Sequence, residues 1–117
     1  MAHASIQSNL PDLPAAIRER IVPHHRGFDI PGHLRALESE HPGLLGAVVR
    51  TIDMLESYPG VESTSVDYDE DDVLFPVTIW ARTVYSGEER FRQILALEHE
   101  AEEILQQYPE LVLVAIL

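Results

Sequence analysis

The residues best suited to chemistry in this chain are a group of histidines and an acidic turn. His24, His25, His33 and His41 lie within one third of the sequence. Imidazole is a common metal ligand and the one side chain that titrates near neutral pH without perturbation. His24 and His25 are adjacent, so both cannot easily face one ion, and no recognised ligand spacing connects the four residues. We expect surface histidines, with His24, His25 and His33 as candidates for a metal or proton-transfer site.

The acidic turn spans residues 67–72. Asp67, Asp69 and Asp71 occupy the first, third and fifth positions of a calcium-loop spacing, in which carboxylate oxygens bind the ion. The sixth position is not Gly and the twelfth is not Glu, so the motif is incomplete, and a solvated turn is the favoured interpretation. The alternative is a metal-dependent enzyme or metal-binding protein that combines this acidic turn with the histidines.

Other catalytic signatures are incomplete or absent. His99 and the next residue begin like a zinc-protease helix, but Glu103 stands where the second histidine is needed. The glycines lie too far apart for a phosphate loop, and no Ser nucleophile elbow is present. The chain has no Cys, which excludes disulfides, thiol catalysis and zinc–thiolate sites. We therefore expect no cofactor and a non-catalytic function.

The composition is that of one globular domain with a strong acidic excess. The chain has 117 residues, of which 45% are hydrophobic, and 20 Asp plus Glu against 8 basic residues give a net charge of −12. The basic residues are all Arg and are scattered between Arg18 and Arg92, so binding to nucleic acid or anionic membranes is disfavoured. The charge favours a basic protein partner, if it steers any encounter.

Hydropathy also bears on location and domain organisation. No apolar stretch approaches the roughly 20 residues that a membrane span requires. The first ten residues lack a basic region followed by an apolar run, so we expect no secretory signal and a cytoplasmic protein. Residues 1–11 are interpreted as a loose tail, and residues 12–117 as a single domain.

Apolar periodicity predicts an α+β domain with the order α-α-β-β-α-β. Ser86 and Glu89 match a capping box at the start of the second long helix, and Pro76 must lie at a sheet edge or a bulge because it cannot donate to a ladder. The predicted elements are a short helix at 13–21, a broken helix at 32–40 and 42–57, strands at 61–68 and 73–85, a helix at 87–107 and a strand at 111–117.

One pattern recurs along the chain. Leu55-x-x-Tyr58-Pro59 is repeated as Leu-x-x-Tyr-Pro at 105–109, and each copy closes a helix before a strand. Two such units around a hairpin suggest a small antiparallel sheet with helices on one face, a split β-α-β plan that resembles ferredoxin-like sheets. Residues 20–30 are the only candidate for the first strand of that plan. This likeness of fold does not indicate a function.

The final strand is apolar at every position, which is typical of a strand covered on both faces. Helices cover one face, so either the N-terminal segment 13–28 folds over the second face or a second copy packs against it. We expect the second alternative, a non-catalytic interaction or regulatory protein that acts as a homodimer through the sheet face or the edge of the final strand. The predicted contact residues lie on the outward side of the long strand and on the final strand: Leu74, Trp80, Val112, Val114 and Ile116.

Overall fold

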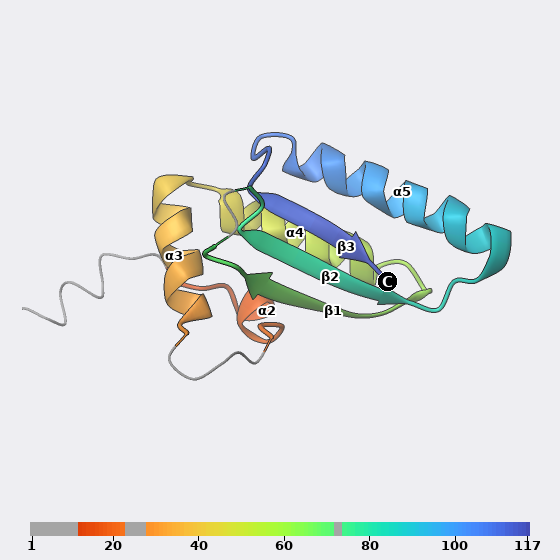
Figure 1. The fold of residues 1–117 in the computed structure, drawn as a ribbon, viewed down its shortest axis with the longest axis horizontal. Coiled ribbons are helices and arrows are strands. Elements are labelled where there is room, and N and C mark those ends of the chain that lie inside the picture. The colour runs from red at the N-terminus through yellow and green to blue at the C-terminus, as the bar shows by residue number, and fades with distance from the viewer. Residues whose placement is uncertain (1–11, 23–27, 72–73) are drawn as a thin grey trace, which may run out of the picture.

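The computed structural model describes residues 12–22, 28–71 and 74–117 (Figure 1). The described residues form an α+β domain in which helices and strands follow the expected order. The elements are α2 (Ala15–Arg18), α3 (Ile30–Glu40), α4 (Leu44–Glu56), β1 (Val61–Tyr68), β2 (Val77–Thr83), α5 (Gly87–Leu105) and β3 (Val112–Ile116).

The strands form one three-stranded mixed sheet in the order β1-β2-β3. β1 and β2 are antiparallel, with Val66 opposite Ile79, and β2 and β3 are parallel, with Ile79 opposite Val114. The sheet is therefore not antiparallel throughout, because α5 returns the chain to the end of the sheet where β2 begins. With three strands in this order among the described residues, the ferredoxin-like arrangement is not confirmed.

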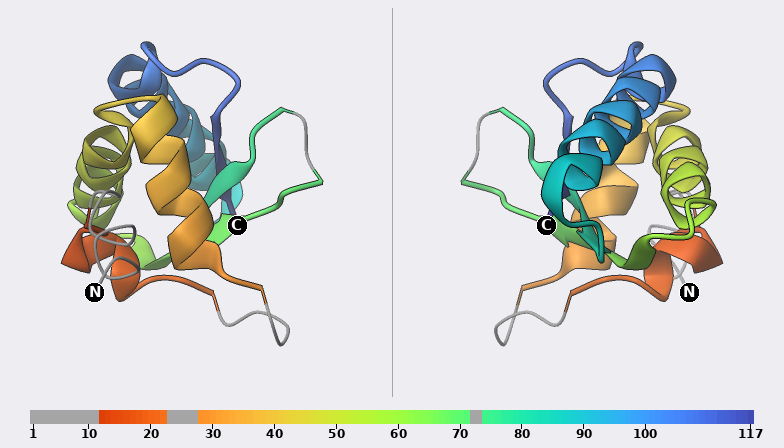
Figure 2. Two further views of the ribbon diagram at one scale, coloured as in Figure 1. Left: turned by 90° about the vertical axis from the view of Figure 1, so that its left-hand side faces the viewer. Right: turned by 90° about the vertical axis from the view of Figure 1, so that its right-hand side faces the viewer.

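The helices lie together on one side of the sheet, and in Figure 1 the viewer looks onto the other, bare face (Figures 1 and 2). α4 is the central helix because its apolar residues recur at three- and four-residue steps and make one continuous buried face. Ile52 of α4 and Ile79 of β2 are fully buried in the same core as Leu34 of α3 and Leu97 of α5. One hydrophobic core thus joins the helices to the covered face of the sheet.

The N-terminal segment closes the β1 edge of the sheet and does not cover its bare face. The Val22 N–H donates to the Val66 carbonyl at 3.0 Å, and the Val66 N–H donates to the Arg20 carbonyl at 2.7 Å. Ile21 and Val66 form a parallel bridge at this edge, and Ile17 of α2 is fully buried in the core. The described part of the segment expected to cover the second face therefore lies elsewhere.

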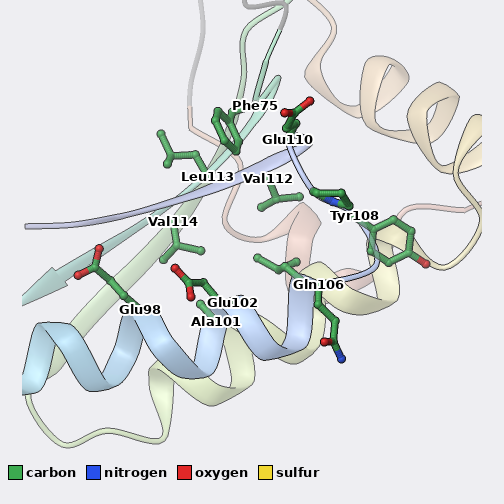
Figure 3. A pocket seen from close by; sticks show the side chains of 12 residues that line it. Phe75, Glu98, Ala101, Glu102, Gln106, Tyr108, Glu110, Val112, Leu113 and Val114 are labelled. Atoms are coloured by element: carbon green, nitrogen blue, oxygen red, sulfur yellow. The ribbon is translucent and has the colours of Figure 1, made fainter.

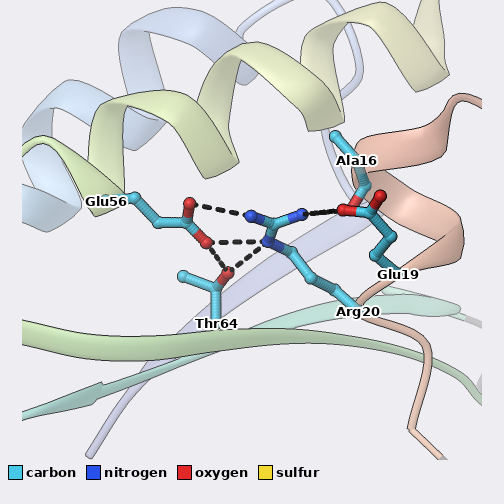
Figure 4. A network of polar contacts seen from close by, with 5 residues as sticks. All are labelled: Ala16, Glu19, Arg20, Glu56 and Thr64. Carbon is cyan, nitrogen blue, oxygen red and sulfur yellow. Dashed lines mark hydrogen bonds and ion pairs between the residues drawn. The ribbon is translucent and has the colours of Figure 1, made fainter.

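A polar network fixes this segment in place (Figure 4). The Arg20 guanidinium donates to both carboxylate oxygens of Glu56, at 2.7 and 2.9 Å, and to the Ala16 carbonyl at 2.7 Å. The Thr64 hydroxyl donates to Glu56 at 2.5 Å. The hydrogen bond from Arg20 holds the pKa of Glu56 below its ordinary value and raises the pKa of Arg20. The network ties the segment to α4 and β1.

Element bounds differ from the predictions where tertiary contacts use the backbone. The helix expected at 13–21 is only the short α2, because residues 20–22 bond to β1 instead. The strand expected from residue 73 begins at Val77, since Phe75 has a φ of 60° and Pro76 cannot donate. The predicted capping box is not formed: Ser86 makes no side-chain cap, and Glu89 accepts from Gln93 at 2.6 Å.

Candidate functional site

The bare face of the sheet has a polar half and an apolar half. The register places Trp80 of β2 between Ser65 of β1 and Ala115 of β3. Ser63 and Asp67 continue the polar half on β1, whereas the apolar half lies on and just after β3. Trp80, Leu113 and Leu117 are 37%, 44% and 51% exposed. Exposed apolar side chains that adjoin one another in this way are typical of an interaction surface.

The outward side of β3 was predicted incorrectly. Val112, Val114 and Ile116 lie opposite Val77, Ile79 and Ala81, whose side chains are buried under the helices. Val112 is only 8% exposed. Because both sides of this strand are apolar, the sequence pattern could not distinguish them, and the register with β2 decides. Leu113, Ala115 and Leu117 are the residues that share the bare face with Trp80.

The remaining predicted contact residues are exposed, as expected. Leu74 lies in the β1–β2 connection and is 48% exposed, and Trp80 projects from the central strand. Among the described residues that the register places on the bare face, the charged side chains are Asp67 and Arg82. The paired positions of this face therefore carry no net acidic charge, in contrast to the chain as a whole, while Glu62 lies in the β1 bulge without a register partner.

A groove of about 360 Å³ lies between α5 and β3 (Figure 3). Ala101 and Leu105 of α5 and Val112 and Val114 of β3 form its apolar walls. Its rim is acidic, and none of the residues that line it is Arg or His. The carboxylates at the rim are those of Glu98, Glu102 and Glu110. Such a groove suits an apolar group flanked by positive charge.

The groove exists because the sheet ends at β3 while α5 extends beyond it. Leu97, Ala101 and Leu105 of α5 are buried, but the apolar side chains of Phe91 and Leu95 on the same helix are 70% and 51% exposed. Figure 1 shows α5 on the side of β3 that faces away from β2. Sequence reasoning missed this groove, although an apolar stripe too wide for a three-stranded sheet was the available signal.

Two strained residues shape the mouth of the groove. Phe75 and Glu110 have φ angles of 60° and 66°, and the Phe75 N–H donates to the Glu110 carbonyl at 2.7 Å. A left-handed conformation costs a residue other than Gly roughly 1–2 kcal/mol. The strain places the Phe75 ring near Leu113 and brings the Glu110 carboxylate to the rim (Figure 3).

The structure brings one candidate histidine to the acidic turn. His33 Nε2 lies 3.2 Å from Glu70 Oε2, and its Nδ1 lies 2.7 Å from the Asp29 carbonyl. The His33 ring stacks on Phe28 at 5.0 Å and lies 5.0 Å from the ring of Tyr68, whose pKa is raised by burial. These contacts make a packed cluster of aromatic and polar side chains beside the turn.

The other metal candidates are not assembled into a site in the described part of the chain. Asp69 accepts a hydrogen bond from the Asp71 N–H at 3.0 Å and so stabilises the turn itself. Within residues 12–22, 28–71 and 74–117, no group of three His, Asp or Glu is placed to hold a metal ion. His24 and His25 lie outside the described residues. His99 pairs with Glu103 at 3.3 Å on an exposed helix face.

The repeated Tyr residues brace α4 against α5. The Tyr58 hydroxyl donates to Glu100 Oε1 at 2.6 Å, and this hydrogen bond raises the pKa of Tyr58 to about 12. The Tyr108 hydroxyl donates to the Pro42 carbonyl at 2.8 Å. Gly43 has a φ of 93°, and a Cβ there would also collide with the Tyr108 hydroxyl. Both Tyr residues of the repeated pattern therefore pack against the core at the ends of helices.

Comparison with known proteins gives no functional information. No protein-family model matches the chain, and neither a curated protein nor a solved structure matches it at a significant level. Within the described residues, no helix has the length and apolar character needed to cross a membrane. The bare face and the groove are therefore the features of the molecule that bear on its function.

Proposed function

We propose that this protein is a small acidic, non-catalytic interaction or regulatory domain that acts as a homodimer, joined through the bare faces of two sheets. The observation that supports the proposal is the exposed apolar half of that face, formed by Trp80, Leu113, Ala115 and Leu117. Removing apolar surface from water stabilises an assembly by about 25 cal/mol per Å². A two-fold contact would place this half of the face on its counterpart in the second copy.

The distribution of charge favours the bare face over other surfaces as the contact between two copies. Two copies that each carry a net charge of −12 repel one another, so association is easiest where acidic side chains are fewest. The bare face carries Asp67 and Arg82, which have opposite signs. The surface of α5 carries Glu98 and Glu102, and a second copy there would place like charges together.

Light scattering and sedimentation equilibrium at micromolar concentration test the proposal. We expect a dimer, and Trp80→Ala should weaken self-association by roughly tenfold or more while leaving the thermal melt little changed, since central aromatic residues dominate such contacts. Phe91→Ala is the matched control, because it removes an exposed aromatic ring from α5 and not from the bare face. A clean monomer throughout the range, or equal effects of the two variants, would contradict the proposal.

A second candidate function is a metal-dependent enzyme or metal-binding protein that uses His33 and the acidic turn. The contact between His33 and Glu70 favours it. Metal analysis of the purified protein and thermal melts with and without divalent cations distinguish the two candidates. A cation that raises the melting temperature of the natural protein but not of His33→Ala would support the metal site, whereas the interaction domain predicts no effect.

We also propose a cytoplasmic location. The acidic composition without cysteine supports this location, because a chain that forms no disulfides does not need an oxidising compartment. Fractionation of cells that produce the full chain tests this proposal, and recovery with the membrane fraction would contradict it.

A further inference from the structure

The edge of β3 presents backbone groups that the described part of the sheet does not use. The Leu117 N–H donates to the Ala81 carbonyl at 2.8 Å, and the Leu117 carbonyl accepts from Thr83 at 3.0 Å. Backbone groups alternate in direction along a strand, so those of Val112, Val114 and Ile116 point away from β2. Among the described residues, no strand lies on that side. These groups can pair with an added strand.

The groove lies directly beside this edge and defines which side chains an added strand could carry. Val112 and Val114 contribute their backbone to the edge and their side chains to the groove wall. Apolar side chains of the added strand would meet these walls, together with Leu105 of α5. Because every second residue of a strand faces the same side, basic side chains would meet the rim carboxylates, Glu98 and Glu102, only at positions that also face the groove.

We propose that the β3 edge and the groove bind an extended segment of a partner protein whose groove-facing residues, every second one along the strand, are apolar at the centre and Lys or Arg on either side. The segment adds to the sheet as a fourth strand beside β3, so backbone pairing supplies affinity and the groove supplies specificity. Charge complementarity selects this occupant over a second copy, because β3 carries no basic residue and its own chain is strongly acidic. This surface meets the bare face at Leu113, which lines the groove, but its edge backbone and its α5 wall lie outside the bare face.

The probe is a short, fluorescein-labelled synthetic peptide in which every second residue, in the order Lys, Val, Val and Lys, faces the groove and Ser lies between them. Its binding to the full chain is followed by fluorescence anisotropy. We expect saturable binding that weakens with salt, because the rim charges are exposed. A peptide with Glu in place of Lys should not bind. A Val–Lys peptide with N-methyl groups on alternate backbone amides keeps its charge but cannot pair with the edge, so it should bind at least about tenfold more weakly. Equal binding of the methylated peptide would overturn strand addition.

Two charge variants of α5 separate the groove from general electrostatic attraction. Glu102→Lys and Glu103→Lys change the net charge equally and lie one residue apart, but only Glu102 lines the groove. We expect Glu102→Lys to weaken peptide binding by about fivefold or more and Glu103→Lys to have a much smaller effect. Equal losses would indicate non-specific attraction and overturn the proposal.

Amide chemical shifts locate the bound peptide. We expect the largest changes at residues 112–116 and along the groove face of α5, while changes centred on the acidic turn at 67–71 would contradict the proposal. Trp80→Ala should leave peptide binding intact, because Trp80 lies on the bare face. Failure of the homodimer proposal and failure of strand addition therefore give different results.

Discussion

The two edges of the sheet are completed in different ways. At the β1 edge, backbone bonds from residues 20–22 occupy Val66, and Arg20 fastens the segment to Glu56 and Thr64. At the β3 edge, the described chain supplies no neighbour, and α5 stands over a groove with an acidic rim. An exposed strand edge is an aggregation hazard, which proteins often limit with charge. The β1 edge is thus held by the chain's own contacts, whereas the β3 edge is the one that we propose for recognition.

Truncating one buried and one exposed side chain should give the largest difference in the free energy of unfolding. Ile17→Ala removes a fully buried anchor of the segment at the β1 edge, and we expect it to reduce the free energy of unfolding by about 2–4 kcal/mol. Leu95→Ala, which truncates an exposed side chain of α5, should change it by less than about 0.5 kcal/mol. Urea denaturation measures both values. Similar losses would show that the open edge also contributes to stability.

Loss of the Arg20 network should reduce the free energy of unfolding by a smaller amount, and its local effects should be confined to the β1 edge. Arg20→Ala breaks the bidentate bond to a partly exposed Glu56, and after solvent screening we expect a loss of about 1–2 kcal/mol. The Val66 amide should also exchange hydrogen faster, while amides at 112–116 remain unchanged. Arg92→Ala, which breaks an exposed pair with Glu89, is the control and should have almost no effect.

The same network has a defined pH dependence. Because the folded-state pKa of Glu56 is lowered, its contribution is present above the ordinary glutamate pKa and is lost as pH falls through the lowered value. Arg20→Ala should therefore bring the stabilities of variant and natural protein closer together in acid. A difference between them that stays constant down to the lowest pH would contradict this assignment.

Relief of backbone strain at the open edge should give the smallest change in the free energy of unfolding, and this change should be an increase. Glu110 has a φ of 66°, a conformation that Gly adopts without the Cβ penalty, so Glu110→Gly should raise the free energy of unfolding by up to about 1 kcal/mol. Glu110→Gln removes the charge and keeps the strain, so it should not stabilise the protein. Thermal melts compare the two variants, and equal stabilities would show that the strain has no measurable cost.

Much of the local structure was predictable from the sequence. The apolar steps of α4 and the alternation that gave β1 its bounds at 61–68 depend on neighbours within the same element. The burial of Val77, Ile79 and Ala81 on one face of β2 followed from the same alternation. The acidic excess, and with it the expectation of a basic partner, required only a count of charges.

The candidate site depended on contacts between distant parts of the chain. An all-apolar strand has no polar side to mark its outward face, so only pairing with β2 could place Leu113 outward and Val114 in the groove. The segment at 20–22 left its helical pattern because an open backbone on β1 offered better hydrogen bonds. The sequence by itself determined which segments are helical, extended or charged, since these are local properties. Only the tertiary structure decided which edge stays open, because that depends on where each strand finds its partner.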